Sequence, residues 1–141
     1  AHFTAPPYSY RELEDPAIHR VMTSYDVYGG RATLIVIYGT TKFYSENPTV
    51  VKVVLGALEE AMAMANADRR KAVQEYIEVT KEKLDPNAIE RFVADKDIGF
   101  NIAPQGIFKV AQFMHGVGSV KNMPASWKDM FFPAIHDRAG N

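Results

Sequence analysis

The residues with the clearest capacity for binding chemistry are Gly29, Gly30 and Arg31, which follow one another in a turn-rich segment. Two glycines permit positive φ angles and let a ligand approach the backbone closely, so their amides are available to an anion. An arginine guanidinium matches the oxygens of a sulfonate or carboxylate with paired donors. The triplet therefore predicts an anion contact, and a solvated loop with an exposed Arg31 is the alternative that the residue types leave open.

A second group of candidate binding residues lies at the start of the chain, on either side of a pair of prolines. The imidazole of His2 and the ring of Phe3 have the chemistry to hold an anionic or planar ligand, and the hydroxyl of Thr4 can donate to an oxyanion. Tyr8 follows the prolines and is a candidate wall of the same site. The alternative is ordinary structure: a histidine bonded to backbone, a core phenylalanine, an unremarkable strand threonine and simple packing by the tyrosine.

The sequence shows no pattern typical of an enzyme or of a metal site. It has no cysteine, so thiol nucleophiles and thiolate metal ligands are excluded. Its histidines lie far apart without a second ligand at metal-binding spacing, and its serines lie in no nucleophile-elbow pattern. We therefore expect no catalytic residue, no metal and no cofactor.

Composition narrows the class of partner. The 16 basic and 17 acidic residues are interspersed and give a formal net charge of −1, so the chain has no electrostatic footprint for nucleic acid or for an anionic membrane. No apolar run approaches the roughly 20 residues of a membrane span. Small molecules or other proteins are the expected partners.

Hydrophobic patterning predicts the elements that would position these candidates. Residues 33–38 are a continuous run of β-branched and other hydrophobic residues between glycines, which predicts a strand buried on both faces. Asn47, as an N-cap, and Pro48 then open a helix that continues to Ala65, with its apolar face formed by Val51, Val54, Leu55, Leu58 and Met62. Its opposite, wetter face is marked by Lys52, Gly56, Glu59, Glu60 and Asn66. A buried strand that feeds an amphipathic helix is the unit of an α/β sheet.

Further helices are predicted from capping residues and apolar spacing. Asp68 and Asp85 are expected N-caps, and Ser126 with Asp129 resembles a capping box for a last short helix that carries Trp127, the expected packing anchor of the C-terminal segment. The predicted helices cover residues 8–14, 69–84, 86–93 and 107–117, and the predicted strands or extended pieces cover residues 1–4, 19–24 and 98–102. The expected fold is α/β, rich in helix and with few strands.

Five blocks of sequence occur in a fixed order along nearly the whole chain: Ala-His-Phe-Thr-Ala-Pro-Pro-Tyr, Leu-Glu-Asp-Pro-Ala-Ile-His-Arg-Val, Asp-Val-Tyr-Gly-Gly, Thr-Thr-Lys-Phe-Tyr-Ser-Glu-Asn-Pro and Pro-Ala-Ser-Trp-Lys-Asp-Met-Phe-Phe-Pro. They resemble the C-terminal part of periplasmic nitrate/sulfonate/taurine-type substrate-binding proteins of ABC transporters. The resemblance implies the C-terminal portion of a two-lobed, type II periplasmic-binding-protein-like fold. Residues 1–28 would be the tail of the second lobe, residues 29–33 the hinge crossing, and residues 34–141 the C-terminal part of the first lobe.

The same resemblance implies capture of a small anionic solute, such as a sulfonate, taurine or nitrate, in a cleft between the lobes. The solute would be delivered in the periplasm to the membrane permease of an ABC importer, without chemistry. His2, Phe3 and Thr4 would then end a strand that lines the cleft. Two alternatives remain open: an enzyme of similar fold that makes the pyrimidine precursor of thiamin, in which His2 is the candidate active-site histidine, and a stand-alone helical interaction domain. Because an uncovered strand edge is a template for pairing, we also expect this chain to self-associate.

Overall fold

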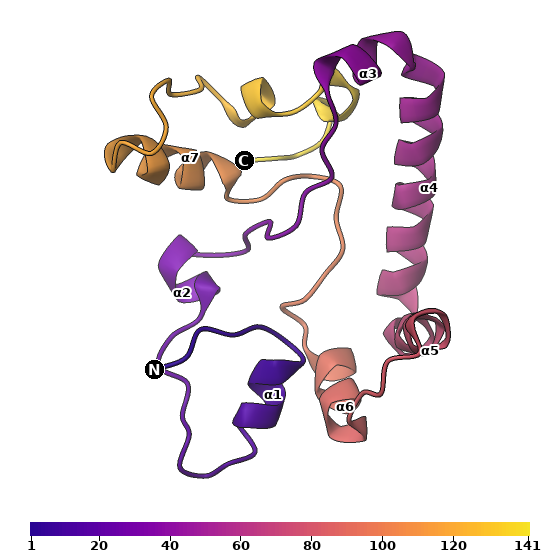
Figure 1. The fold of residues 1–141 in the computed structure, drawn as a ribbon, viewed down its shortest axis with the longest axis vertical. Coiled ribbons are helices and arrows are strands. Elements are labelled where there is room, and N and C mark those ends of the chain that lie inside the picture. The colour runs from indigo at the N-terminus through magenta and orange to yellow at the C-terminus, as the bar shows by residue number, and fades with distance from the viewer. The chain divides into compact units, whose positions relative to one another are not determined.

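A computed structural model describes residues 1–141, and the architecture is helical, with 52% of the residues in helices and none in a strand (Figure 1). The α-helices and the two short 3-10 helices follow one another as α1 (Tyr8–Glu12), α2 (Ser24–Tyr28), α3 (Thr41–Glu46), α4 (Pro48–Ala67), α5 (Arg69–Thr80), α6 (Pro86–Ala94), α7 (Ile107–Gly116), η1 (Trp127–Met130) and η2 (Pro133–Ile135). None of the helices is both long and apolar enough to cross a bilayer.

The expected α/β fold, with its portion of a two-lobed periplasmic-binding-protein-like architecture, is wrong. A strand exists only where a second strand pairs with it, and residues 34–38 make no backbone hydrogen bond to any other segment. Their side chains are between 50% and 93% exposed rather than buried on both faces. The β-branched run is therefore extended but unpaired, and no sheet forms around it.

The other predicted strands or extended pieces, residues 1–4, 19–24 and 98–102, form no strand either, and for the last two the competing contacts are visible. At the end of residues 19–24, Thr23 and Asp26 form a reciprocal capping box, and this box starts α2 at Ser24. In residues 98–102, the side chain of Asn66 takes the place of a neighbouring strand: it donates to the carbonyl of Phe100 at 2.7 Å and accepts from the amide of Phe100 at 3.1 Å. Side-chain hydrogen bonds thus satisfy backbone groups that a sheet would otherwise pair.

The predicted helix caps are largely confirmed. Asp68 accepts from the amide of Lys71 at 3.0 Å, and Asp85 accepts from Asn87 at 2.8 Å ahead of the helical Pro86. The Ser126 capping box is present as well. Asn47 directly precedes α4, as predicted, and its carbonyl accepts from the amide of Val51 at 3.1 Å. Its side-chain amide, however, donates to the carbonyl of Phe43 at 3.0 Å and so closes α3 instead of capping α4.

The chain divides into two compact units, and α4 begins in one and ends in the other. The first unit contains residues 1–21 and 60–100. Here α6 packs against α1 and α5, and Val73 of α5 and Ala88 of α6 are buried. Polar contacts tie these helices together: the hydroxyl of Tyr10 donates to Asp95 at 2.7 Å, and Arg91 donates to the carbonyl of Tyr10 at 2.7 Å.

The second unit contains residues 22–59 and 101–141, and its centre is Trp127. The expected role of Trp127 as a packing anchor is confirmed, because the ring is buried and meets Phe131 and His136 edge to face at centroid distances of 6.0 and 5.9 Å. Backbone bonds draw three separate segments together here: Thr33 donates to Gln105 at 2.8 Å, and Asn141 donates to Pro104 at 3.0 Å.

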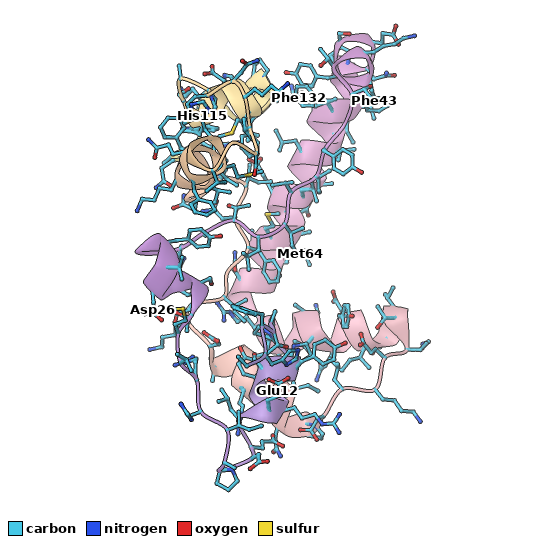
Figure 2. All side chains as sticks on the ribbon, turned by 60° about the vertical axis from the view of Figure 1, so that its left-hand side comes forward. Glu12, Asp26, Phe43, Met64, His115 and Phe132 are labelled. Carbon is cyan, nitrogen blue, oxygen red and sulfur yellow. The ribbon has the colours of Figure 1, made fainter.

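The apolar face expected for the long helix is only partly covered, because Val51, Leu55, Leu58 and Met62 are half-buried and Val54 is exposed. No residue of α4 is buried, although Val54 was predicted to face a core. Phe43 and Met64, labelled in Figure 2, are 49% and 56% exposed. The buried apolar residues of the whole chain are Val73, Ala88, Ala103, Ala111 and Trp127. Helix caps and polar contacts therefore contribute much of the stability of these helices.

The packing around Trp127 gives a first prediction. A Cβ atom on Gly140 would lie 2.9 Å from Cε2 of Trp127 and 3.0 Å from the ring of Pro104, so Gly140→Ala must displace one of them. We expect the free energy of unfolding to fall by about 1–3 kcal/mol. Denaturant unfolding monitored by the fluorescence of the single tryptophan measures this change. Gly56→Ala is the control, because it adds a methyl to helix α4 in open space and should stabilise by roughly 0.5–1 kcal/mol. Equal effects of the two substitutions would contradict the packing described here.

Candidate functional site

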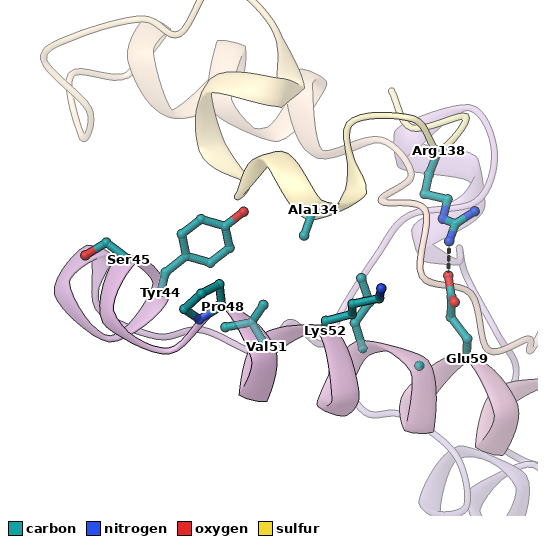
Figure 3. Close-up of a pocket in the computed structure, with 10 residues that line it drawn as sticks. Tyr44, Ser45, Pro48, Val51, Lys52, Glu59, Ala134 and Arg138 are labelled. Atoms are coloured by element: carbon teal, nitrogen blue, oxygen red, sulfur yellow. Dashed lines mark hydrogen bonds and ion pairs between the residues drawn. The ribbon is translucent and has the colours of Figure 1, made fainter.

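A groove of about 600 Å³ lies in the second unit, between α4 and the C-terminal segment that carries η2 (Figure 3). This volume falls in the range of ordinary ligand pockets. Residues of α4 at helical spacing form one side, and the C-terminal segment supplies the other. The lining residues are Tyr44, Ser45, Pro48, Val51, Lys52, Leu55, Gly56, Glu59, Ala134 and Arg138.

The two ends of the groove are closed by different interactions. At one end Tyr44 stacks on Phe132, with ring centroids 4.2 Å apart and planes 9° from parallel. At the other end the guanidinium of Arg138 pairs with the carboxylate of Glu59, drawn as a dashed line in Figure 3. These contacts join α3 and α4 to residues some eighty positions later, and so they set the width of the groove.

Lys52 is the chemically distinctive residue between these two ends. Its ammonium forms no hydrogen bond and no ion pair in the structure, whereas the neighbouring cation Arg138 is already engaged by Glu59. Val51, Leu55 and Ala134 provide apolar surface beside it. The groove therefore combines an unpaired positive charge with an apolar wall, an arrangement suited to a small anion that carries a hydrocarbon part.

A second hollow in the same unit, of about 460 Å³, has a different character. It lies between α7 and residues 120–130 and is lined mainly by aliphatic and thioether side chains, including Ile107, Met114 and Met123. Asp129 is the ionisable residue in its lining, and that carboxylate already accepts from the amides of Ala125 and Ser126. This hollow has no positively charged side chain that could bind an anion.

The predicted binding residues at the start of the chain lie in the first unit, in exposed positions. Nδ1 of His2 lies 2.7 Å from Oε1 of Glu12, so the imidazole has a carboxylate partner. Phe3 is 94% exposed and is not a core residue. Thr4 is exposed, and Tyr8 is the first residue of α1 and 64% exposed. None of these four side chains lines either of the two hollows described above.

The predicted anion-binding triplet lies in the second unit, where its glycines end α2. Gly29 has φ 71° and Gly30 has φ 149°, both rarely adopted by other residues. Their amides donate to the carbonyl of Tyr25 at 2.8 and 3.0 Å, so neither amide is offered to a ligand. Arg31 follows with an exposed side chain.

The groove residues were not singled out from the sequence as a site. Lys52 and Glu59 were assigned to the wet face of the long helix, and that face does carry polar residues. What turns this face into one side of a groove is contact with Ala134 and Arg138, far along the chain. The spacing of Val51, Lys52 and Leu55 carries no signal of that distant partner.

Asp95 is the most heavily bonded carboxylate in the first unit. Burial raises its pKa, but the hydroxyl of Tyr10, the amides of Asp97 and Ile98 and the charge of Arg69 outweigh burial, so the net pKa lies below the ordinary 3.8. Arg69 also donates to the carbonyls of Asp95 and Ile98. A perturbed carboxylate is a common sign of a catalytic group. Here each partner belongs to the packing of α1, α5 and α6, so the carboxylate acts structurally.

No group of three or more histidine, aspartate or glutamate side chains is arranged to hold a metal ion. Comparisons of the chain with models of protein families, with curated proteins and with solved structures find no match. The resemblance to solute-binding proteins therefore stays a hypothesis drawn from the sequence blocks.

The hydrogen bonds to Asp95 predict a specific dependence of stability on pH. A carboxylate whose pKa is lower in the folded state than its ordinary 3.8 stabilises the fold above that pH, and this contribution disappears as the pH falls through the folded pKa. Asp95→Asn should therefore be less stable than the wild type at neutral pH, and the difference should shrink below about pH 4. Urea denaturation across this pH range measures both effects. Glu14→Gln, a change in an exposed carboxylate of the same unit, is the control. A difference that is constant with pH would contradict the assignment.

Proposed function

We propose that this chain captures a small anionic solute for an ABC importer and passes it unchanged to the membrane permease, in the periplasm. The transport role rests on the order of the five sequence blocks. The proposed binding site is the groove between α4 and η2, and no cleft between α/β lobes is involved. Sulfonates, taurine and nitrate remain the candidate solutes.

The proposal that the ligand is an anion is based on the unpaired ammonium of Lys52 in the groove. A cation without a partner beside an apolar wall gains a charge-assisted hydrogen bond when an anion arrives. The carboxylate of Glu59 works in the opposite direction, because it occupies the guanidinium of Arg138 and adds negative charge to the same groove. Anion binding therefore depends on whether Arg138 stays paired with Glu59.

A second candidate function is a helical interaction domain, and the exposure of apolar side chains favours it. Twenty-three large hydrophobic residues are exposed, among them Val53 and Val79 on helices, while five apolar residues are buried. A surface of this kind is usual where another protein covers it. The two functions are separable by experiment, because solute capture depends on Lys52 and an interaction surface does not.

Substitutions in the groove test the proposed function. With taurine, ethanesulfonate and nitrate as probes, we expect amide chemical shifts to move around Lys52, Ala134 and Arg138. Lys52→Met should weaken binding by about tenfold, the loss of one charge-assisted hydrogen bond. Glu59→Gln should strengthen binding, because it releases Arg138 from its ion pair. Lys83→Met, in an exposed residue outside the groove, is the matched control.

Other outcomes separate the site from the function. Changes in amide chemical shift could instead be confined to the residues predicted from sequence, which are His2, Phe3, Thr4 and Tyr8, or Gly29, Gly30 and Arg31. That result would support anion binding but would assign the site to those residues and not to the groove. Absence of binding by all three anions at millimolar concentration would contradict solute capture by this chain.

A further inference from the structure

Residues 34–38, here called the open segment, are a strand-forming stretch without a neighbour. The segment reads Leu-Ile-Val-Ile-Tyr, all residues that favour strands apart from the leucine. Its backbone amides and carbonyls make no hydrogen bond within the chain. Ile35 is 87% and Tyr38 is 93% exposed. An extended backbone with unmet donors and acceptors and apolar side chains on both faces is a template for pairing with another strand.

The ends of the open segment are held in place, which limits how far a pairing can extend. Just before it, the amide of Thr33 donates to the carbonyl of Gln105 at 2.8 Å, and the hydroxyl oxygen of Thr33 accepts from the amide of Gln105 at 2.9 Å. Shortly after it, Thr40 caps α3 through its hydroxyl, 3.0 Å from the amide of Phe43. A ladder on this segment is therefore about five residues long and ends at structured positions.

The geometry points to a second copy of this chain as the occupant: we propose that two open segments pair antiparallel about a two-fold axis at Val36. In this register Leu34 lies opposite Tyr38 of the second copy, and Ile35 lies opposite Ile37 of the second copy. Each cross-strand pair joins two apolar side chains, the pairing that stabilises sheets. The same surface serves both copies, as a two-fold interface requires.

Charge does not oppose pairing with a copy of the same chain. No charged residue lies between Arg31 and Lys42, so the two segments meet without like charges in the ladder. The chain as a whole carries a net charge of −1, so two copies do not repel each other strongly. This association surface is separate from the groove, whose lining begins at Tyr44, and it does not depend on anion binding.

Sedimentation equilibrium over a wide range of concentration tests the proposal. We expect the apparent mass to rise with concentration from 15.8 kDa toward twice that value. The infrared band typical of antiparallel strands should grow together with the mass. With the two-fold axis at a non-hydrogen-bonded pair of Val36 residues, Ile37 exchanges ladder bonds with Ile35 of the second copy, so Ile37→Pro removes a ladder donor. Ile35→Lys places a charge opposite an apolar side chain, so each substitution should abolish the doubling. Neither side chain supports a core, so helix content by circular dichroism should not change.

Val53→Lys is the charge-matched control, because Val53 is an exposed apolar residue of α4 outside the open segment. The proposal stands if Val53→Lys doubles in mass like the wild type while Ile35→Lys and Ile37→Pro do not. It is overturned if the wild type stays a monomer at high concentration or if association persists in Ile37→Pro. It is also overturned if Val53→Lys disrupts association equally, since that result would assign the contact to helical apolar surface.

Discussion

An extended backbone satisfies its amides and carbonyls against a neighbouring strand, against side chains or against water. In this chain the segment best suited to a sheet, residues 34–38, has no neighbouring strand. Without a sheet there is no central layer for the helices to cover, and each helix must be held by its own caps and by contacts with one or two others. The buried apolar residues are accordingly few, and the long helix α4 keeps no residue buried.

The stabilising interactions that remain are local or polar. In the first unit, the carboxylate of Asp95 accepts hydrogen bonds from the hydroxyl of Tyr10 in α1 and from amides in the loop that follows α6. Arg69, at the start of α5, donates to the carbonyls of Asp95 and Ile98 in that loop. In the second unit, Trp127 is the one large side chain that is buried, and the backbone around Gln105 joins segments that precede and follow it. The groove depends on two further contacts, the Tyr44–Phe132 stack and the Glu59–Arg138 ion pair, because they join the C-terminal segment to α3 and α4.

Sequence patterns predicted what is decided within a few residues. Asp68, Asp85 and the Ser126 capping box are correct because a cap needs only the side chain and the next three amides. The strand at residues 33–38 was wrong because pairing depends on a partner elsewhere in the chain, which β propensity does not supply. The helix α2 was missed although Thr23 and Asp26 have capping-box spacing, since the apolar residues before them drew the interpretation toward a strand. Lys52 was assigned to the polar face of the long helix, but no local pattern indicates that Ala134, far along the chain, lines the same groove.

Site-resolved amide hydrogen exchange on dilute protein shows whether residues 34–38 have a strand partner within the chain. We predict that these amides exchange at rates close to those of an unstructured peptide, while the amide of Thr33, bonded to Gln105, and the amides within α4 are protected. Protection of residues 34–38 equal to that of α4, in protein shown to be monomeric, would contradict this prediction, because it would require a neighbouring strand inside the chain.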